Sequence, residues 1–483
     1  MKETSKRLCM AALAASVIGA CSEESRRTND EVQPAKTDMA SAVFVHLFEW
    51  RWPDVAQECE DFLGPNGYKA VQVSPPQEHV PGPQWWTRYQ PVSYLVESRG
   101  GSRAEFADMV QRCRNAGVDV YADAISNHMA DIGEGTGVAG SEYTEYSYPV
   151  PYSYDDFHHC GRNGDDRIAN YQDLWEVQHC NLGVLPDLDT GNAEVRQKIA
   201  AYLNDLLSLG VTGFRLDAAK HVHHEEIRQY LALLDSEPYL YQEVIDRGGE
   251  PINAMDYLVN GPVTEFKYPQ AMFEAFEGRR LASLSDFDIQ AGYLPSDKAI
   301  VFVDNHDVQR GHAGGEDILN YKDGALYDLA NVFMLGWPYG YPMVMSSYEF
   351  DDSDQGPPQS RPVDGNDCAP GWVCEHRRTS RTGMVGFRRV TAGMPVTDWQ
   401  AFGDEVISFG RGDKGHVVIN IGTEIVNGTF VTRMIPGEYC NVLQGLTTEK
   451  DCVDSKVRID DDGVLQLSVA PMSAVAIHSA AKK

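Results

Sequence analysis

The chain has 483 residues, a length that is too great for one small domain and predicts two or three. Its 71 acidic side chains outnumber its 41 basic ones, and the formal net charge is -30. Such a surface repels nucleic acid and anionic membranes, so we exclude nucleic acid as a partner and expect a neutral or cationic ligand.

The first residues have the features of an export signal. A short basic segment precedes the apolar run 8–18, which is too short to span a bilayer. The run leads into "IGAC", which resembles a bacterial lipobox. We therefore predict a lipoprotein-type signal peptide over 1–21, lipid anchoring at Cys21, and a polar tether over 22–40. A simply secreted protein cleaved nearby is the alternative, so the protein is either an envelope lipoprotein or extracellular.

The cysteines other than Cys9 and Cys21 would lie in an oxidising compartment, where pairing is the default. Their even number favours disulfides, and no short-spaced Cys/His cluster predicts zinc. Spacing leaves open how they pair: Cys59, Cys113, Cys160, Cys180, Cys368, Cys374, Cys440 and Cys452.

Short runs rich in β-branched residues recur along the chain, with amphipathic helical stretches between them. In the stretch before the fourth run, Asn192 is placed to cap a helix, an apolar stripe extends from Val195 to Leu207, and Gly210 ends it. Eight alternations of strand and helix are typical of an α/β fold of the (β/α)8 (TIM) barrel type. The eight runs are "VFVHLF" at 43, "AVQVS" at 70, "VDVYADA" at 118, "GFRLD" at 213, "YLYQEV" at 239, "VTEF" at 263, "IVFVD" at 300 and "MVMSS" at 343.

The rest of the chain divides around this barrel. The segment 127–188, between the third and fourth runs, is too long for an ordinary loop and predicts a small inserted domain. From 394 the pattern changes to alternating strands, "VISFGRG", "HVVINIG", "TFVTRM" and "VLQLSV", without a helical period. We expect an all-β domain of Greek-key type over 394–483 and the barrel over 41–126 and 189–393.

Polar residues fall at the carboxyl ends of the predicted strands, where barrel enzymes carry their catalytic groups. In "GFRLDAAKH", Arg215 and Asp217 share one face of a strand while Phe214 and Leu216 share the other, because side chains alternate. We expect Phe214 and Leu216 to pack on the helix layer and the charged pair to project inward near the mouth. An ion pair that only closes the barrel is the alternative.

Glu243 and Asp307 end other strands, so they and Asp217 could converge on one cleft. Glycoside hydrolysis requires such carboxyl groups: one acts as nucleophile or base, and another stays protonated to protonate the leaving oxygen. In "WWTRYQP", Trp85 and Trp86 offer flat apolar rings on which sugars stack. Aromatic packing in the core is the alternative for these rings.

Nine motifs together resemble a known family. "HLFEWRW", "VQVSPP", "WW.RYQPVSY", "DAISNH", "GFRLDAAKH", "YQEVID", "FVDNHD.QRGH", "VMSSY" and "GWVCEHR" occur in the order found in the alpha-amylases of glycoside hydrolase family 13, in particular the animal-type branch that also occurs in bacteria. The resemblance extends from about residue 43 nearly to the C-terminus.

The resemblance implies a catalytic trio and a set of sugar contacts. Asp217 would be the nucleophile, Glu243 the general acid/base and Asp307 the residue that stabilises the transition state, in a retaining double displacement. The implied substrate-binding residues are Trp85, Trp86, Tyr89, Gln90, His128, Tyr171, Arg215, Lys220, His221 and His306.

The resemblance also implies a structural Ca²⁺ at the inserted domain. Its ligands would be side-chain oxygens of Asn127 and Asp187 and backbone carbonyls of Gln178 and His221, which form a hard oxygen shell. Ordinary turn roles are the alternative for Asn127 and Asp187. The implied disulfides are Cys59–Cys113, Cys160–Cys180, Cys368–Cys374 and Cys440–Cys452, whereas Val96 replaces a cysteine of a further bridge in animal members.

Two further features depart from the family pattern. Chloride-activated relatives hold the anion through an arginine, an asparagine and a third, basic residue; here Arg215 and Asn305 are present but Met343 takes the third place. Loss of that positive charge weakens anion binding, so we expect catalysis largely independent of chloride, unless a basic residue from elsewhere fills the gap. The glycine-rich loop 311–315, "GHAGG", is one residue shorter than the family's mobile loop.

The resemblance predicts a monomeric enzyme that hydrolyses internal α-1,4-glucosidic bonds of starch, glycogen and maltooligosaccharides. An exo-acting or transglycosylating relative that forms maltooligosaccharides has the same trio and is the first alternative. A noncatalytic glucan-binding lipoprotein on the cell surface is the second, and the complete trio argues against it.

Overall fold

A computed structural model describes residues 40–483 except 132, 150–151, 290–291, 315–316, 447–450 and 454–455. The predicted signal peptide and Cys21 lie outside the described residues, as does nearly all of the tether. In the part of the chain that is described, no helix is both long and apolar enough to cross a bilayer.

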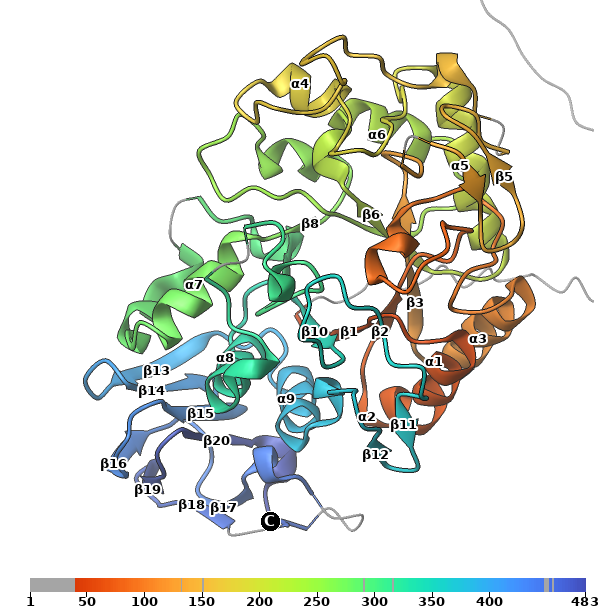
Figure 1. Cartoon of the computed structure of the whole chain (residues 1–483). Helices are drawn as coiled ribbons and strands as arrows, with labels where there is room; N and C mark the ends of the chain where they lie inside the picture. Colours follow the sequence, from red (N-terminus) through yellow and green to blue (C-terminus); the bar gives the residue numbers. More distant parts are fainter. Residues whose placement is uncertain are drawn as a thin grey trace, which may run out of the picture. The chain divides into compact units, whose positions relative to one another are not determined.

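Eight parallel strands of the described chain close into a barrel in the order β1-β10-β9-β8-β7-β6-β3-β2 (Figure 1). Each overlaps one of the eight runs predicted from the sequence, so the barrel is confirmed. The shortest, β8, pairs with β7 at Gln242 and with β9 at Ala299. The strands are β1 (Phe44–Leu47), β2 (Ala70–Val73), β3 (Asp119–Ile125), β6 (Gly213–Asp217), β7 (Tyr239–Gln242), β8 (Val263–Thr264), β9 (Ala299–Val301) and β10 (Tyr341–Ser346).

Helices cover the barrel, and α5 (Ala193–Ser208) follows the predicted pattern. Asn192 caps it by accepting a bond from the Glu194 N–H, and Gly210 has a φ of 97° just beyond its end. The strict alternation of strand and helix is wrong at one place: a short 3-10 helix, Ala254–Val259, joins β7 to β8, in a segment rich in Gly, Pro and Asn. The other helices are α1 (Trp52–Glu58), α2 (Gly64–Asn66), α3 (Arg103–Asn115), α6 (His224–Leu231), α7 (Lys267–Phe276), α8 (Ala325–Gly336) and α9 (Thr379–Val390).

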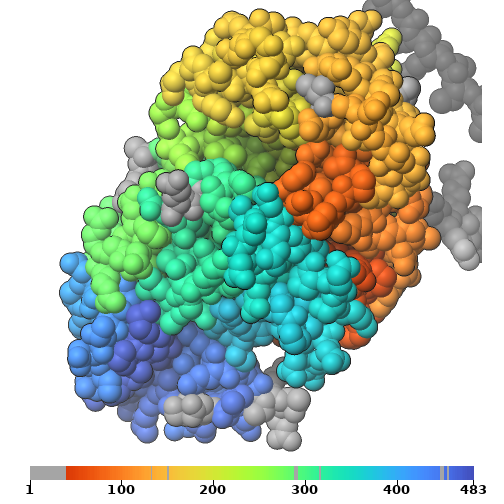
Figure 2. Space-filling view, in the orientation of Figure 1, coloured from red at the N-terminus to blue at the C-terminus, as the bar shows by residue number. Residues whose placement is uncertain are grey.

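The segment between β3 and α5 leaves the barrel and contains little regular structure. Its elements are β4 (Gly135–Thr136), β5 (Glu142–Tyr143) and α4 (Leu174–His179). In Figure 2, the yellow surface of this segment adjoins the red-orange surface of the residues after β2. The carboxylate of Glu78 joins the two, because its Oε1 accepts bonds from the N–H groups of Ala139 (2.9 Å) and Ser141 (3.1 Å). A small hairpin, β11 (Val363–Asp364) and β12 (Asp367–Cys368), follows β10.

The C-terminal part is all β, as predicted. Its described strands form two four-stranded antiparallel sheets, β13-β14-β15-β20 and β16-β19-β18-β17. They share an apolar core in which Val418 and Ile477 meet Phe430 and Leu465. The strands are β13 (Val396–Ala401), β14 (Val406–Arg411), β15 (Gly415–Asn420), β16 (Val426–Val431), β17 (Gly437–Cys440), β18 (Lys456–Ile459), β19 (Val464–Val469) and β20 (Ser473–His478).

Disulfides connect the described cysteines in the four pairs that the resemblance implied. They are Cys59–Cys113, Cys160–Cys180, Cys368–Cys374 and Cys440–Cys452.

Candidate active site

Arg215 is the centre of a buried charge cluster at the carboxyl ends of β3, β6 and β7. Its Nη1 donates to Asp123 Oδ1 at 2.7 Å and to Asp217 Oδ1 at 2.6 Å. Its Nη2 forms an ion pair with Glu243 Oε1 at 2.5 Å. Phe214 instead belongs to the apolar core of the helix layer. The alternation in "GFRLD" therefore separates packing residues from charged ones, and the pairing joins carboxylates of three strands.

Burial dominates the titration of this cluster. It raises the pKa of Asp123 to about 7, and Arg215 lowers it only in part. Burial and the nearby Asp217 also raise the pKa of Glu243, although Arg215 and the Ala218 N–H oppose the shift. The pKa of Glu243 is thus shifted in the direction that a general acid requires.

Asp307 lies on the turn that follows β9. The Asn305 side chain shapes this turn, since its Oδ1 accepts bonds from the N–H groups of Asp307 (3.0 Å) and Val308 (2.9 Å). Burial and Glu243 raise the pKa of Asp307 well above its ordinary value. The neighbouring His306 stacks on Tyr89 with ring centroids 5.1 Å apart, and burial lowers its pKa, so the imidazole is neutral.

A cavity of about 810 Å³ opens above these carboxyl groups. Asp217, Glu243 and Asp307 line it, as do all the predicted substrate-binding residues except Arg215, which is 3% exposed and lies behind the carboxylates. Arg215 contacts two of the lining carboxyl groups, Asp217 and Glu243. The predicted residues on the wall are Trp85, Trp86, Tyr89, Gln90, His128, Tyr171, Lys220, His221 and His306.

Several cavity residues were not predicted from the sequence. Glu250 forms an ion pair with Lys220 at 2.5 Å, and the ammonium of Lys220 lies 5.2 Å from the ring centre of Tyr171. Arg247 donates to the carbonyl oxygen of Gly314 in the glycine-rich loop, whose last residue, Gly315, lies outside the described residues. Other unpredicted wall residues are Leu182, Gly183, Val184, Leu185, Ala218, Ile245, His312, Ala313 and Asp354.

The aromatic wall of the cavity includes Trp85, Trp86 and Tyr89, and hydrogen bonds fix this part of the chain. Trp85 is 5% exposed, and its Nε1 donates to the carbonyl oxygen of Ser353 at 2.8 Å. Trp86 is half-buried. His128 Nε2 lies 2.9 Å from the carbonyl oxygen of Tyr89, and burial lowers the pKa of His128 to about 4, so its neutral ring donates this bond.

The residues named for Ca²⁺ lie together where the segment after β3 meets the barrel. A β-bridge joins His128 to Asp187, which brings Asn127 beside Asp187. Asn127 Oδ1 is buried and, among the described residues, has no hydrogen-bond partner. His221 Nδ1 donates to the carbonyl oxygen of Val177 at 3.0 Å. No group of three His, Cys, Asp or Glu side chains in the described ranges could hold a metal, so a cation here would need amide and carbonyl oxygens, as Ca²⁺ accepts.

The third position of the chloride-binding pattern is apolar. Met343 is 5% exposed and packs in a cluster with Phe44, Ile300 and Phe302. Arg215, the cation of that pattern, already has carboxylate partners.

A parallel (β/α)8 barrel whose strand ends present a buried acid, a second carboxylate and an aromatic wall in one cavity defines a glycoside hydrolase. Residues 82–280 match the model of the alpha-amylase catalytic domain, and residues 397–480 match the alpha-amylase C-terminal all-beta domain.

Similar proteins agree with these matches. The alpha-amylase of Streptomyces violaceus is 44% identical, over 92% of this chain and 75% of that protein. Human alpha-amylase 1B is 41% identical, over 93% and 96%. The crystal structure of alpha-amylase I from Eisenia fetida has a TM-score of 0.86 at 38% identity, over 91% of this chain and 97% of that one. A mutant of that enzyme was solved in complex with maltohexaose, with the same TM-score. The chain therefore belongs to the alpha-amylase family.

Proposed function

We propose that the protein hydrolyses internal α-1,4-glucosidic bonds of starch-type glucans and maltooligosaccharides with retention of anomeric configuration. One observation carries the proposal: Arg215 forms ion pairs with both Asp217 and Glu243. These two carboxyl groups line one cavity together with Asp307 and the tryptophans. Relatives of 41–44% identity named alpha-amylases support the same activity.

Each carboxyl group has a separate task in this reaction. Glu243, whose pKa is raised by burial, donates its proton to the glycosidic oxygen, while Asp217 attacks the anomeric carbon. Asp217 Oδ1 accepts the bond from Arg215, which leaves Oδ2 for the attack. Glu243 then removes a proton from water, which hydrolyses the glycosyl-enzyme, and Asp307 stabilises the positive charge of the sugar in both transition states.

Digestion of soluble starch tests the proposal. We expect mixed short maltooligosaccharides, a rapid fall in iodine staining and products initially in the α-anomeric form by NMR. Glu243→Gln should abolish turnover and retain starch binding. A single product size would favour the exo-acting or transglycosylating alternative, β-anomeric products would refute retention, and unchanged turnover of the variant would refute the role of Glu243.

We also propose that Asn127, Gln178, Asp187 and His221 hold a structural Ca²⁺, which would join the inserted segment 127–188 to the barrel. The unpartnered Asn127 Oδ1 supports this assignment. Removal of Ca²⁺ by a chelator should lower Tm, because an ion bound to the folded state stabilises it, and Ca²⁺ but not Mg²⁺ should restore it. An unchanged Tm in a calorimeter after exhaustive chelation would contradict the assignment.

The disulfides indicate an oxidising compartment outside the cytoplasm. We propose that the enzyme is monomeric and that a lipid on Cys21 attaches it to the cell envelope. Mass spectrometry of the exported protein would detect the acylated N-terminal cysteine, and an unmodified N-terminus would favour simple secretion.

A further inference from the structure

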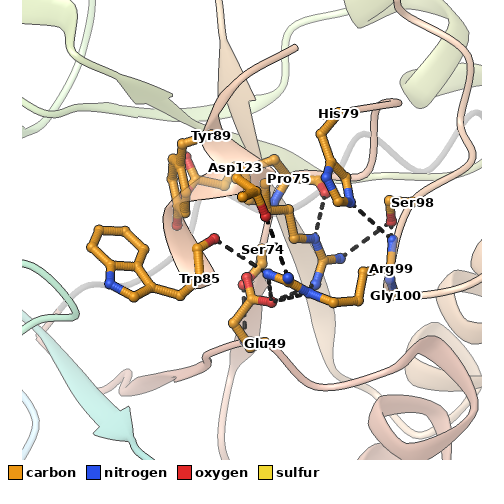
Figure 3. A network of polar contacts seen from close by, with 12 residues as sticks. Glu49, Ser74, Pro75, His79, Trp85, Tyr89, Ser98, Arg99, Gly100 and Asp123 are labelled. Atoms are coloured by element: carbon orange, nitrogen blue, oxygen red, sulfur yellow. Dashed lines mark hydrogen bonds and ion pairs between the residues drawn. The ribbon is translucent and has the colours of Figure 1, made fainter. Parts of the chain in front are cut away.

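Arg99 is not among the residues that line the cavity, yet its guanidinium contacts the backbone of the segment that carries the tryptophans. Its Nη1 donates to the carbonyl oxygens of Gly82 and Gln84, both at 3.1 Å. Its Nη2 donates to the carbonyl oxygen of Trp85 at 3.2 Å (Figure 3). Arg99 therefore holds the backbone where the 3-10 helix Trp85–Tyr89 begins, and this helix carries both tryptophans.

Glu49 anchors this guanidinium to the barrel. The Nε and Nη2 of Arg99 both donate to Glu49 Oε2, at 3.0 and 2.7 Å. Glu49 is 3% exposed and follows β1, and its own N–H donates to Ser74 Oγ beyond β2 at 2.9 Å. Although burial raises the pKa of Glu49, Arg99 and Arg88 more than offset this and lower it, so the carboxylate stays charged.

The backbone around the pair is held in an unusual conformation. Glu49 has a φ of 64°, in the left-handed region that residues other than glycine rarely adopt. The N–H of Arg99 donates to His79 Nε2 at 3.1 Å. Burial lowers the pKa of His79 to about 4, so this ring is neutral and its Nδ1 donates to the carbonyl oxygen of Val80 at 2.8 Å. Strain of this kind persists where the surroundings fix it, often near functional sites.

We propose that Arg99, held by Glu49, is a positioning residue that fixes the tryptophan wall, Trp85 and Trp86, and thereby sets the affinity for the glucose units that bind against this wall. Arg99 does not line the cavity, so its effect would pass through the tryptophans. The indole of Trp85 is fixed by Ser353, but Arg99 is the side chain that bonds its carbonyl oxygen. This inference rests on the proposed glucan hydrolysis.

Steady-state kinetics on maltoheptaose tests the role of Arg99. In Arg99→Gln, we expect KM to rise about tenfold and kcat to change by less than about threefold, since ground-state binding is lost and the catalytic carboxylates are untouched. Arg99→Lys keeps the positive charge and should recover some of the affinity. The recovery should be incomplete, because one ammonium group cannot reproduce the planar set of donors of arginine. Arg103→Gln is the matched control. It removes an arginine whose exposed ion pair with Asp205 (2.5 Å) joins α3 to α5, and KM should not change.

Stability is separated from positioning by a second variant. Arg99→Gln leaves the buried carboxylate of Glu49 with Arg88, at 3.5 Å, as its ion-pair partner, and should lower Tm. Glu49→Gln/Arg99→Gln also leaves the buried Arg88 without this carboxylate, so it should lower Tm further. The raised KM should persist in this double variant at temperatures where it is fully folded. Unchanged KM in either folded variant, or a fall in kcat alone that follows the folded fraction, would overturn the inference. Absence of hydrolysis by the unaltered protein would instead refute the proposed function.

Discussion

Arg215 and burial shift the pKa of the acid Glu243 in opposite directions. Burial and Asp217 raise the pKa of Glu243, and the positive charge of Arg215, 2.5 Å from Glu243 Oε1, lowers it. The general acid must be protonated, so kcat/KM falls as the pH rises through this pKa. The balance between burial and Arg215 therefore sets the alkaline limit of activity.

Replacement of this arginine gives a pH prediction. In Arg215→Gln, the effect that lowers the pKa of Glu243 is lost, so the pKa rises and the alkaline limb of kcat/KM moves to higher pH, while kcat falls. Profiles of kcat/KM for both enzymes at constant ionic strength would measure this. A limb that stays in place or moves to lower pH would show that Arg215 does not govern the acid.

Met343 gives a prediction about anions. It lies among Phe44, Ile300 and Phe302, so an anion near Arg215 would gain no second cation from this strand and would lose its hydration. Activity in halide-free buffer should therefore change by less than about twofold when chloride is added, since chloride has no second cation to hold it. Met343→Lys is the informative variant: it should gain chloride dependence if the position faces the anion. A steep chloride response of the unaltered enzyme would contradict the prediction.

Strand periodicity alone predicted only part of the site, whereas loop residues such as Trp85 and Tyr171 were predicted from residue type or from the family resemblance. Arg215 and Asp217 share a face because strand side chains alternate, and Glu243 directly follows the next strand. Arg247 and Asp354 reach the cavity from loops, and no periodicity reports where a loop folds back. Arg99 was also missed, because its contacts with Gly82, Gln84 and Trp85 are to backbone carbonyl oxygens, which leave no residue-type signal in the sequence.

Among the elements, core strands were easier to predict than connections. The barrel strands are buried on both faces and read as apolar runs. The link from β7 to β8 lacks an α-helix because Gly248, Gly249 and Pro251 interrupt any helical period. In the C-terminal part, β13, β17, β18 and β20 were not named from the sequence. Of these, β17 and β18 are short, and exposed residues alternate in β18.

Glu78 gives a prediction about the hairpin of β4 and β5. Its carboxylate is fully buried; Oε1 accepts the N–H groups of Ala139 and Ser141, and Oε2 accepts the Ser93 hydroxyl at 2.5 Å. Glu78→Gln keeps the shape of the side chain but removes its negative charge and one of its two acceptor oxygens. We expect this to lower the free energy of unfolding by about 2 kcal/mol. Limited proteolysis should cut the segment 135–143 several times faster in the variant.

Two results would separate this local effect from general destabilisation. The control is Glu142→Gln, which changes an exposed carboxylate of the same hairpin. It should leave the cutting rate unchanged, because an exposed side chain has little desolvation to lose. Equal cutting of both variants, or cutting elsewhere first, would mean that Glu78 does not hold the hairpin.

At the scale of the whole molecule, the net charge of -30 opposes the compact state. Like charges repel more strongly when folding brings them together, and salt screens them beyond about 10 Å at 0.1 M. Surface ion pairs such as Arg103–Asp205 weaken in salt, but each contributes little to stability. We therefore expect Tm at neutral pH to rise by several degrees between low salt and about 0.5 M salt, where screening is short-ranged.

The cause of this rise can be isolated with two measurements. Sodium acetate should raise Tm as much as sodium chloride, because screening depends on ionic strength, whereas a specific chloride site would favour chloride alone. Near the sequence pI of about 4.8 the net charge vanishes, so the same salts should have little effect there. A salt effect of equal size at both pH values would show that exclusion of salt from the surface, and not relief of charge repulsion, stabilises the protein.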